Sequence, residues 1–402
     1  SQWIIDIPTY DGGTVKGTAD AGSNDFQFYI TDTTLAEYDA YCAKLAANGY
    51  TCQMTTVKSG NKFALYTGES SDIYVYYIDA YKAVRIITSD PDTRYPEHFV
   101  QNGAPSYTKI TNSTITQMEL DYAAESFGMC YIITLEDGSF IVYDGGLGYG
   151  QDAAKLYSTL KSLNKRSDGK IVISAWMLTH EHSDHFNTFA KFCKTYGGGG
   201  SKVQVKAAYV NYSGPANHSN AYNPSTLISG GSNYTDISAA VGGMDLITVR
   251  TGMEFYICNV KMEVLYTEED VYPNVLNFFN DTSVVTRATI SGQTFVFLGD
   301  VRYVGSAVLC DMYGKDLKAD FVQVSHHGWD GGTVDLYANI DPVAAFWPGN
   351  AGEFISQYSA GGTTQAVSRF LRDKSNCKDF WNQSQTTTLT LPFKHGDPVK
   401  VS

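Results

Sequence analysis

Hydrophobic and polar positions in the first hundred residues predict a small α+β unit. FQFYI at 26–30 predicts a strand, and the later runs CQMTTVK, KFALYT, IYVYYID and AVRIITS are β-branched or aromatic, as strands are. After the first strand, LAEYDAYCAKLAANGY places apolar residues near helical spacing and ends at Gly49, a helix stop. We therefore expect one helix and five strands in this part of the chain.

A segment with little periodicity marks the expected end of this unit. SDPDTRYPEHFVQNGAPSYTK contains three prolines, which is typical of a linker. A chain of 402 residues is also too long for one ordinary domain. We therefore predict a small α+β domain over residues 1–108 and a second domain over residues 109–402.

The second domain alternates predicted strands and helices. It opens with three strands, ITQMELD, MCYIITL and SFIVYDGG. Two helical patterns, AAKLYSTLKSL and HFNTFAKFCKTYG, flank the apolar strand IVISAWMLTH. Further strands run from VQVKAAYVN through MEFYICN, KMEVLYT, SVVTRATI and TFVFLGD to ADFVQVSHHG. Strands with interspersed helices predict a four-layer αββα sandwich, so the chain is expected to be of the α/β (α+β) class.

Composition narrows the range of partners. The net charge of −13 disfavours extended nucleic-acid binding, because an acidic surface repels phosphate backbones. No apolar run approaches the ~20 residues needed to cross a bilayer. The seven cysteines include no C-x-x-C pair, so no structural zinc ribbon is expected. The chain starts with Ser1 and is rich in Tyr, Gly, Ser and Asn, which weakly favours export, with a cytoplasmic location as the alternative.

Five of the eight histidines fall in two short clusters, and the first is THEHSDH, directly after the apolar strand IVISAWML. In an extended stretch, His180 and His182 project to the same side. Asp184 and His185 then stand at the turn into a helix. This mixture of imidazole and carboxylate suits two adjacent sites for a metal such as Zn²⁺, whereas the alternative is a polar surface loop with accidental histidines.

The second cluster is SHHG, at the end of the apolar strand DFVQV. Loops at strand ends are where rigid folds place catalytic groups, although a turn with a single capping histidine is the alternative. Between the two clusters, Asp300 ends TFVFLGD and would sit at a sheet edge, where its carboxylate could bridge two cations. A strand that ends in Gly-Asp also makes ordinary turns, so the order of the three motifs carries the interpretation.

In that order, T-H-x-H-x-D-H, L-G-D and S-H-H-G resemble the metallo-β-lactamase superfamily over roughly residues 109–350. Within the superfamily, the chain resembles the branch that contains the hydrolase domain of bacterial DNA-uptake channel proteins and the pneumococcal phosphorylcholine esterase. The N-x-x-S of residues 280–283 and the D-G-G of residues 144–146 match two further features of that branch.

The resemblance implies two metal sites that share one carboxylate. His180 and His182 would bind the first ion, and His218, after strand VQVKAAYVN, is the candidate for its third ligand. Asp300 would bridge the two ions. The ligands of the second ion would be Asp184, His185 and His327.

The resemblance also implies a cofactor and a mechanism. Two divalent ions are expected, with Zn²⁺ favoured and Mn²⁺ or Fe as alternatives. Such ions lower the pKa of a bound water towards ~7, and the resulting hydroxide attacks a carbonyl or phosphoryl centre. Asp184 and Asp300 would orient this nucleophile, and His326 would either support the site or act as a general acid. These three are the expected catalytic residues.

Three functions remain open at this point. The first is hydrolysis of a phosphodiester, such as a phosphorylcholine or nucleotide-like ester, on a small molecule or a surface polymer. The second is hydrolysis of an amide, lactone or thioester by the same site. The third is a non-catalytic binding or sensing module that retains the fold.

Overall fold

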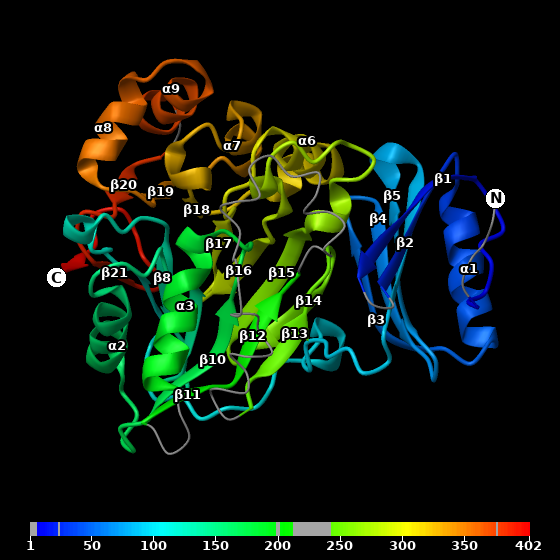
Figure 1. Ribbon diagram of the computed structural model, residues 1–402, viewed down its shortest axis with the longest axis horizontal. Coiled ribbons are helices and arrows are strands. Elements are labelled where there is room, and N and C mark those ends of the chain that lie inside the picture. Colours follow the sequence, from blue (N-terminus) through cyan, green and yellow to red (C-terminus); the bar gives the residue numbers. More distant parts are fainter. Residues whose placement is uncertain (1–5, 23–24, 198–201, 212–242, 375–376) are drawn as a thin grey trace.

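The structure is a computed structural model with three β-sheets and their flanking helices (Figure 1). Its description covers residues 6–22, 25–197, 202–211, 243–374 and 377–402. No helix within these ranges combines the length and the apolar character that a membrane span requires.

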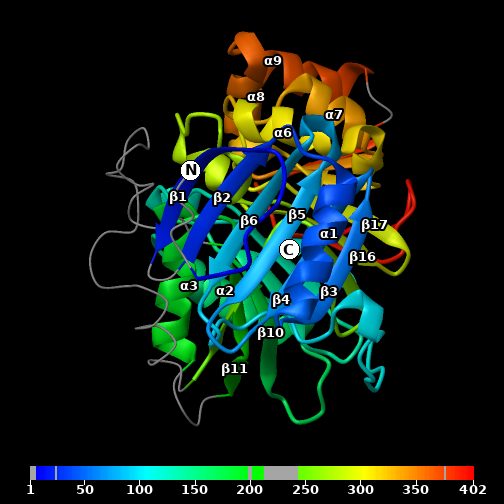
Figure 2. The ribbon, with the colours of Figure 1, turned by 90° about the vertical axis from the view of Figure 1, so that its right-hand side faces the viewer.

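The N-terminal residues form a six-stranded antiparallel sheet in the order β1-β2-β6-β5-β4-β3, which Figure 2 views face on. Helix α1 (Leu35–Ala47) covers its outer face (Figure 1) and begins with a capping box between Thr34 and Glu37. The strands are β1 (Thr14–Gly22), β2 (Asp25–Thr31), β3 (Thr51–Lys58), β4 (Asn61–Thr67), β5 (Asp72–Ile78) and β6 (Ala83–Ser89).

The predicted helix and five strands match α1 and β2 to β6, but strand β1 was not predicted. Its sequence, TVKGTADAG, has few large apolar residues, because it is an edge strand that pairs, within the described part of the chain, with β2 alone. Backbone hydrogen bonds to a neighbour therefore define this strand, and such bonds leave no hydrophobic pattern.

The apolar run of strand β5 is unbroken because both faces of this strand are covered. Side chains alternate across a sheet, so Ile73, Val75 and Tyr77 pack with α1, whereas Tyr74 and Tyr76 belong to the large core cluster that continues into the rest of the chain. Because both faces are covered, every residue of the strand is buried. The division at residue 108 stays a prediction, since one hydrophobic cluster joins the two parts.

The remaining residues form two stacked sheets. The first has nine strands, in the order β13-β12-β10-β9-β8-β7-β21-β22, with β11 also paired to β10. Its strands are β7 (Thr114–Gln117), β8 (Cys130–Thr134), β9 (Phe140–Asp144), β10 (Ile171–Met177), β11 (Val203–Val205), β12 (Ala207–Val210), β13 (Asp245–Thr248), β21 (Thr387–Thr390) and β22 (Lys400–Val401). The C-terminal residues thus return to this sheet through the pairing of β21 with β7.

The second central sheet has seven strands in the order β14-β15-β16-β17-β18-β19-β20. Its strands are β14 (Glu254–Ile257), β15 (Val260–Tyr266), β16 (Val285–Ile290), β17 (Gln293–Phe297), β18 (Phe321–Gln323), β19 (Ala344–Trp347) and β20 (Asp379–Asn382). The strands β17, β18, β19 and β20 pair in parallel, so their carboxyl ends lie at one edge of the sheet.

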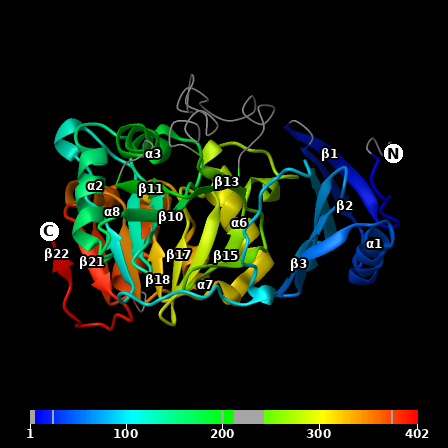
Figure 3. The same cartoon turned by 90° about the horizontal axis from the view of Figure 1, so that it is seen from below.

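Helices cover the outer faces of both central sheets, as Figure 3 shows for α3 on one side and α7 on the other. In β9, Ile141 and Tyr143 face the core between the sheets, whereas Phe140 and Val142 face the helices α2 and α3. The helices are α2 (Asp152–Leu163), α3 (Ser183–Tyr196), α6 (Tyr303–Tyr313), α7 (Val334–Ile340), α8 (Ala351–Ser359) and α9 (Gly362–Arg369). The expected four-layer αββα sandwich with an additional N-terminal α+β unit is confirmed.

Candidate metal centre

The first histidine motif lies where two parallel strands end side by side. β9 and β10 pair in parallel, so their carboxyl ends meet at one edge of the nine-stranded sheet. Asp144, the last residue of β9, accepts hydrogen bonds from the amide of Thr179 at 2.8 Å and from its hydroxyl at 2.7 Å. These bonds hold the start of the loop that carries His180 and His182.

Helix α3 begins directly after this loop. His182 is its N-cap residue, and Asp184 lies in the first turn, where a carboxylate interacts favourably with the helix dipole. His185 follows in the same turn and is fully buried. Its Nδ1 lies 2.6 Å from Asp144 Oδ2, so its Nδ1 proton is donated to that carboxylate and Nε2 can act as a ligand.

The other half of the centre comes from the seven-stranded sheet. Asp300 follows β17, and Gln323 of β18 holds the connecting loop, because its Oε1 accepts from the amides of Leu298 at 2.7 Å and Gly299 at 2.8 Å. Gly299 has a φ of 55°, and a Cβ there would approach the side chain of Ser283 to 2.9 Å. Glycine is therefore required at this position. Ser283 Oγ in turn accepts a hydrogen bond from the Asp300 amide at 3.0 Å.

Two carboxylates and two imidazoles converge at one point. His185 Nε2 lies 3.1 Å from Asp300 Oδ2 and 3.5 Å from Asp184 Oδ2. His327 Nε2 lies 3.2 Å from Asp184 Oδ2 and 3.4 Å from Asp300 Oδ2. The four side chains form a group whose ligand atoms all lie within 4.8 Å of one another.

A second group lies beside the first and shares one residue with it. It consists of His180, His182 and Asp300, again with ligand atoms within 4.8 Å of one another. His180 Nε2 lies 3.7 Å from Asp300 Oδ2 and 3.0 Å from His182 Nδ1. Asp300 thus stands between two potential cation positions, and neither group draws on the part of the N-terminal sheet that the structure describes.

Two of the potential ligand atoms are buried and have no hydrogen-bond partner in the part of the chain that the structure describes, as is expected of atoms that bind a metal ion. Asp300 Oδ1 and His182 Nε2 are buried and make no hydrogen bond within the described residues. Buried polar atoms without partners are costly, and a cation would satisfy both of these atoms. His327 Nδ1 lies 3.2 Å from the carbonyl oxygen of Pro348 and donates its proton there, so Nε2 can bind a cation once it releases its own proton.

The electrostatics of the centre also favour a cation. Burial alone would raise the pKa of Asp300, but His185 and His327 lower it well below its usual range, and they lower that of Asp184 too. Burial alone would lower the pKa of His185 and His327, but the carboxylates raise both, that of His327 to about 10. Burial and the neighbouring imidazoles lower the pKa of His180, so its ring is neutral. Protons and cations compete for these carboxylates, so metal binding is expected to release protons.

Asn280 completes the surroundings of Asp300. Its Nδ2 donates to Asp300 Oδ2 at 3.2 Å and lies 3.4 Å from His182 Nδ1. Asp281 Oδ1 accepts from the amides of Arg302 at 2.7 Å and Gly305 at 3.0 Å, and so holds the start of α6. Sequence reasoning noted the N-x-x-S pattern here but assigned these residues no role.

The structure brings together six of the seven sequence-predicted ligands, namely His180, His182, Asp184, His185, Asp300 and His327. The seventh, His218, lies outside the described residues. His326, an expected catalytic residue, belongs to neither ligand group, but it lines the cavity beside them, and its Nδ1 is buried without a hydrogen-bond partner in the described chain. The individual roles of all these residues stay predictions.

A cavity of about 480 Å³ opens onto the centre. Its walls combine the site residues with aromatic side chains, one arginine and one glutamate. The lining residues are Tyr122, Phe127, His182, Ser183, Asp184, Phe278, Asn280, Asp300, Arg302, His326, His327, Trp329, Pro348 and Glu353.

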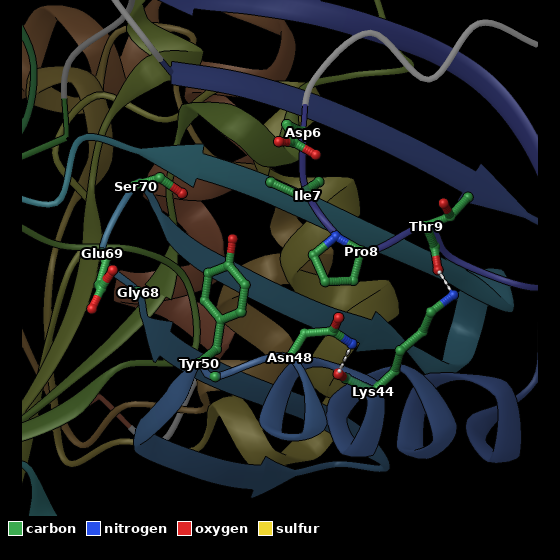
Figure 4. Close-up of a pocket in the computed structure, with 11 residues that line it drawn as sticks. Asp6, Ile7, Pro8, Thr9, Lys44, Asn48, Tyr50, Gly68, Glu69 and Ser70 are labelled. Carbon is green, nitrogen blue, oxygen red and sulfur yellow. Dashed lines mark hydrogen bonds between the residues drawn. The ribbon is translucent and has the colours of Figure 1, made fainter.

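A second cavity, of about 670 Å³, lies in the N-terminal unit between its first described residues and the end of α1 (Figure 4). Lys44 there donates to the carbonyl oxygen of Thr9 at 2.8 Å, and Asn48 donates to the carbonyl oxygen of Lys44 at 2.8 Å, so these polar groups bind one another. None of the residues that line this cavity in the described chain is a histidine or a cysteine. The cavity beside Asp300 is therefore the candidate site.

Several solved structures match this one at low sequence identity. A mutant of CmlA, a diiron β-hydroxylase from Streptomyces venezuelae, matches with a TM-score of 0.42 and 11% identity over 71% of this chain and 55% of its own. The metallo-β-lactamase fold protein YhfI from Bacillus subtilis matches with a TM-score of 0.37 and 10% identity over 68% and 96%. A mutant metallo-β-lactamase from Cronobacter sakazakii matches with a TM-score of 0.32 and 12% identity over 63% and 88%. The chain thus spans about half the length of CmlA.

No curated protein matches the chain. Residues 123–237 match the model of the metallo-beta-lactamase superfamily, and this segment includes the THEHSDH motif. The narrower resemblance to the DNA-uptake and phosphorylcholine esterase branch stays a prediction. The family match over residues 123–237 and the His/Asp cluster at the strand ends together support a domain similar to those of the metallo-β-lactamase superfamily.

Proposed function

We propose that this chain is a metal-dependent hydrolase whose site binds two divalent cations. The observation that carries the proposal is the pair of ligand groups that share Asp300. Imidazole nitrogens and carboxylate oxygens suit Zn²⁺, with Mn²⁺ or Fe as alternatives. The buried Asp300 Oδ1, which has no protein partner in the described chain, is the atom that a second cation would use.

When bound, two adjacent cations acidify a water molecule and stabilise negative charge that develops on the ester oxygens. Asp300 and Asp184 would hold the cations and orient the attacking water. Asp144 holds the ring of His185 in the ligating tautomer, and the Pro348 carbonyl does the same for His327. Asn280 donates to Asp300 Oδ2, so it limits the direction in which that carboxylate can turn.

His326 is the proposed partner of the leaving group. It lines the cavity, and its ring centroid lies 6.1 Å from that of His327. Burial lowers the pKa of His326, so the neutral ring predominates at pH 7. We therefore assign it a hydrogen bond from a ring N–H to the departing oxygen, in place of full proton transfer from an imidazolium ion.

A phosphodiester is the proposed substrate, on a small molecule or on a surface polymer. Two cations side by side can stabilise both the attacking and the leaving oxygens of an in-line displacement at phosphorus. The chain as a whole carries a net charge of −13, which disfavours long polyanions and is compatible with a single ester group in the cavity.

The test combines metal content with turnover. Protein purified without chelator and incubated with Zn²⁺ or Mn²⁺ is expected to hold two ions per chain by elemental analysis, and to hydrolyse bis(p-nitrophenyl) phosphate. His182→Ala should lose one ion and most of the turnover. His395→Ala is the matched control, because His395 is exposed and contacts Asp379.

Fewer than one ion per chain would refute the metal site. Two ions without hydrolysis of any phosphoester, amide, lactone or thioester would instead identify a non-catalytic binding module. Faster hydrolysis of a lactone or thioester than of the diester would show that the substrate is an acyl compound and not a phosphodiester.

A further inference from the structure

Arg302 is a buried cation in the wall of the candidate site. It follows Asp300 by two residues and lines the same cavity. Its side chain is only 9% exposed, and its guanidinium lies over the ring of Phe278, another lining residue, at 3.5 Å from the ring centroid. The backbone is equally well held, because the Arg302 amide donates to Asp281 Oδ1 at 2.7 Å. The position of this charge is therefore set by the fold.

The hydrogen-bonding capacity of Arg302 is only partly used. Its Nη2 donates to the hydroxyl of Tyr303 at 2.7 Å and to the carboxylate of Asp330. Its Nε is buried and has no hydrogen-bond partner in the described chain. A guanidinium has five N–H donors in a planar fork that matches phosphate oxygens, so a buried one with an unused donor beside a cavity is suited to an anion.

The charge of the cavity points to the same ligand. Apart from histidines, the titratable acidic and basic side chains that line it in the described chain are three carboxylates, Asp184, Asp300 and Glu353, and one arginine, Arg302. Two bound dications would carry four positive charges, which exceed the three negative charges of Asp184, Asp300 and Glu353, whereas the charge of Arg302 is paired with Asp330. The loaded cavity would then carry net positive charge although the chain is acidic, which favours an anionic substrate over a neutral one.

We propose that Arg302 binds a non-bridging, negatively charged oxygen of the substrate and so selects anionic phosphoesters over neutral esters. This inference rests on the proposed hydrolase function and deepens it by naming the feature of the substrate that the protein recognises. The exposed rings of Phe127 and Trp329, 46% and 49% exposed, lie at the same cavity and would contact the organic part of the ester.

The alternative is that Arg302 only anchors Asp330 and contributes to folding. The two roles separate experimentally, because Asp330→Asn removes the anchored carboxylate and leaves the guanidinium in place. Arg372 offers a matched control, since it is also stacked on aromatic rings, 5.3 Å from the centroid of Phe354 and 5.0 Å from that of Phe380, but does not line the cavity.

The experiment compares Arg302→Gln, Arg302→Lys, Asp330→Asn and Arg372→Gln with the wild type, all loaded with metal. The readouts are kcat/KM for bis(p-nitrophenyl) phosphate and for neutral p-nitrophenyl acetate, the calorimetric Kd of phenylphosphonate, and metal content. In Arg302→Gln we expect kcat/KM for the diester to fall by ~10–100-fold and the Kd of phenylphosphonate to rise about as much, since a hydrogen bond to a charged group is lost.

Most of the remaining readouts should stay close to wild type. The neutral ester should change by less than about threefold in Arg302→Gln, metal content should be unchanged, and Arg302→Lys should lie between wild type and Arg302→Gln, because it keeps the charge without the planar fork. Asp330→Asn and Arg372→Gln should retain the preference for the diester.

Two results would overturn the assignment. One is an equal loss for both esters in Arg302→Gln, and the other is an Asp330→Asn variant that reproduces the whole effect. The phosphonate measurement keeps this inference separate from the proposed function. Weaker phosphonate binding in Arg302→Gln would support the anion site even if the wild type cleaved no ester, and unchanged binding would refute it whatever the activity.

Discussion

Asp300→Asn is the most informative single change at the candidate site. The amide has nearly the volume of the carboxylate, so the substitution removes a negative charge and little else. Asp300 is fully buried, and its Oδ2 lies 3.1 Å from His185 Nε2, 3.4 Å from His327 Nε2 and 3.7 Å from His180 Nε2. Among the described residues, Asp300 is the member that the two ligand groups share.

The expected magnitude follows from that position. Two unit charges 4 Å apart interact by ~4 kcal/mol at an effective dielectric of ~20. Loss of one carboxylate charge between two dications therefore weakens the binding of the more loosely held ion by at least ~10³-fold, at ~1.4 kcal/mol per factor of ten. The metal content should fall from two ions to one or fewer, and kcat/KM for the diester should fall by a similar factor.

The assay measures metal content by elemental analysis, metal affinity by chelator competition, and diester turnover. Asp144→Asn is the control, because Asp144 acts through the His185 ring, with Oδ2 at 2.6 Å from its Nδ1. Loss of such a support typically costs 10–100-fold in affinity or activity, so Asp144→Asn should be milder. If Asp300→Asn kept two ions and full turnover, the shared-carboxylate assignment would be wrong.

Two further predictions concern stability and are measured by urea unfolding. Gly299→Ala should destabilise the protein by ~2–3 kcal/mol, because the added methyl group clashes as well as straining the backbone. Gly292→Ala, also at positive φ (81°) but with open space around it, should cost only ~1 kcal/mol, and equal losses would refute the steric argument. Burial alone would raise the pKa of Glu263, but Arg287 and Lys58 outweigh it and lower the pKa to about 2. The stabilisation from Glu263 is therefore complete above its unfolded pKa and lost as the pH falls towards 2. At pH 7 the free energy of unfolding of Glu263→Gln should be ~3 kcal/mol below that of the wild type, and this difference should shrink as the pH falls. A difference that stayed constant over that range would contradict the assignment.

Two buried tyrosines of the N-terminal sheet bind the rest of the chain. The hydroxyl of Tyr76 donates to Asp270 Oδ1 at 2.7 Å, and that of Tyr74 donates to the carbonyl oxygen of Thr251 at 2.7 Å. Both tyrosines are fully buried in the cluster that continues between the central sheets. The N-terminal strands therefore form a separate sheet, and the apolar face of that sheet packs against the sandwich.

Local patterns in the sequence determined most of the elements around the site. IVISAWM became β10, HFNTFAKFCKTYG became most of α3, and LAEYDAYCAKLAANGY became α1. These segments have periods of two or near 3.6 because one or both faces are buried, and a periodic burial pattern is visible without the structure. The helices α6 to α9 were not predicted. Short helices depend on tertiary packing more than on their own propensity, and their periodicity is correspondingly weak.

The sequence alone also indicated which side chains are the candidate ligands, because THEHSDH, LGD and SHHG keep the metal-binding residue types within short segments at strand ends. The shared position of Asp300 was predicted from the resemblance, but only the tertiary structure decided that Asn280 touches Asp300 and that Arg302 lines the same cavity. These residues come together because β9 and β10 of one sheet and β17 and β18 of the other end at the same side of the sandwich. The stacking of two sheets depends on long-range packing, and a periodicity of two or 3.6 residues contains no information about it.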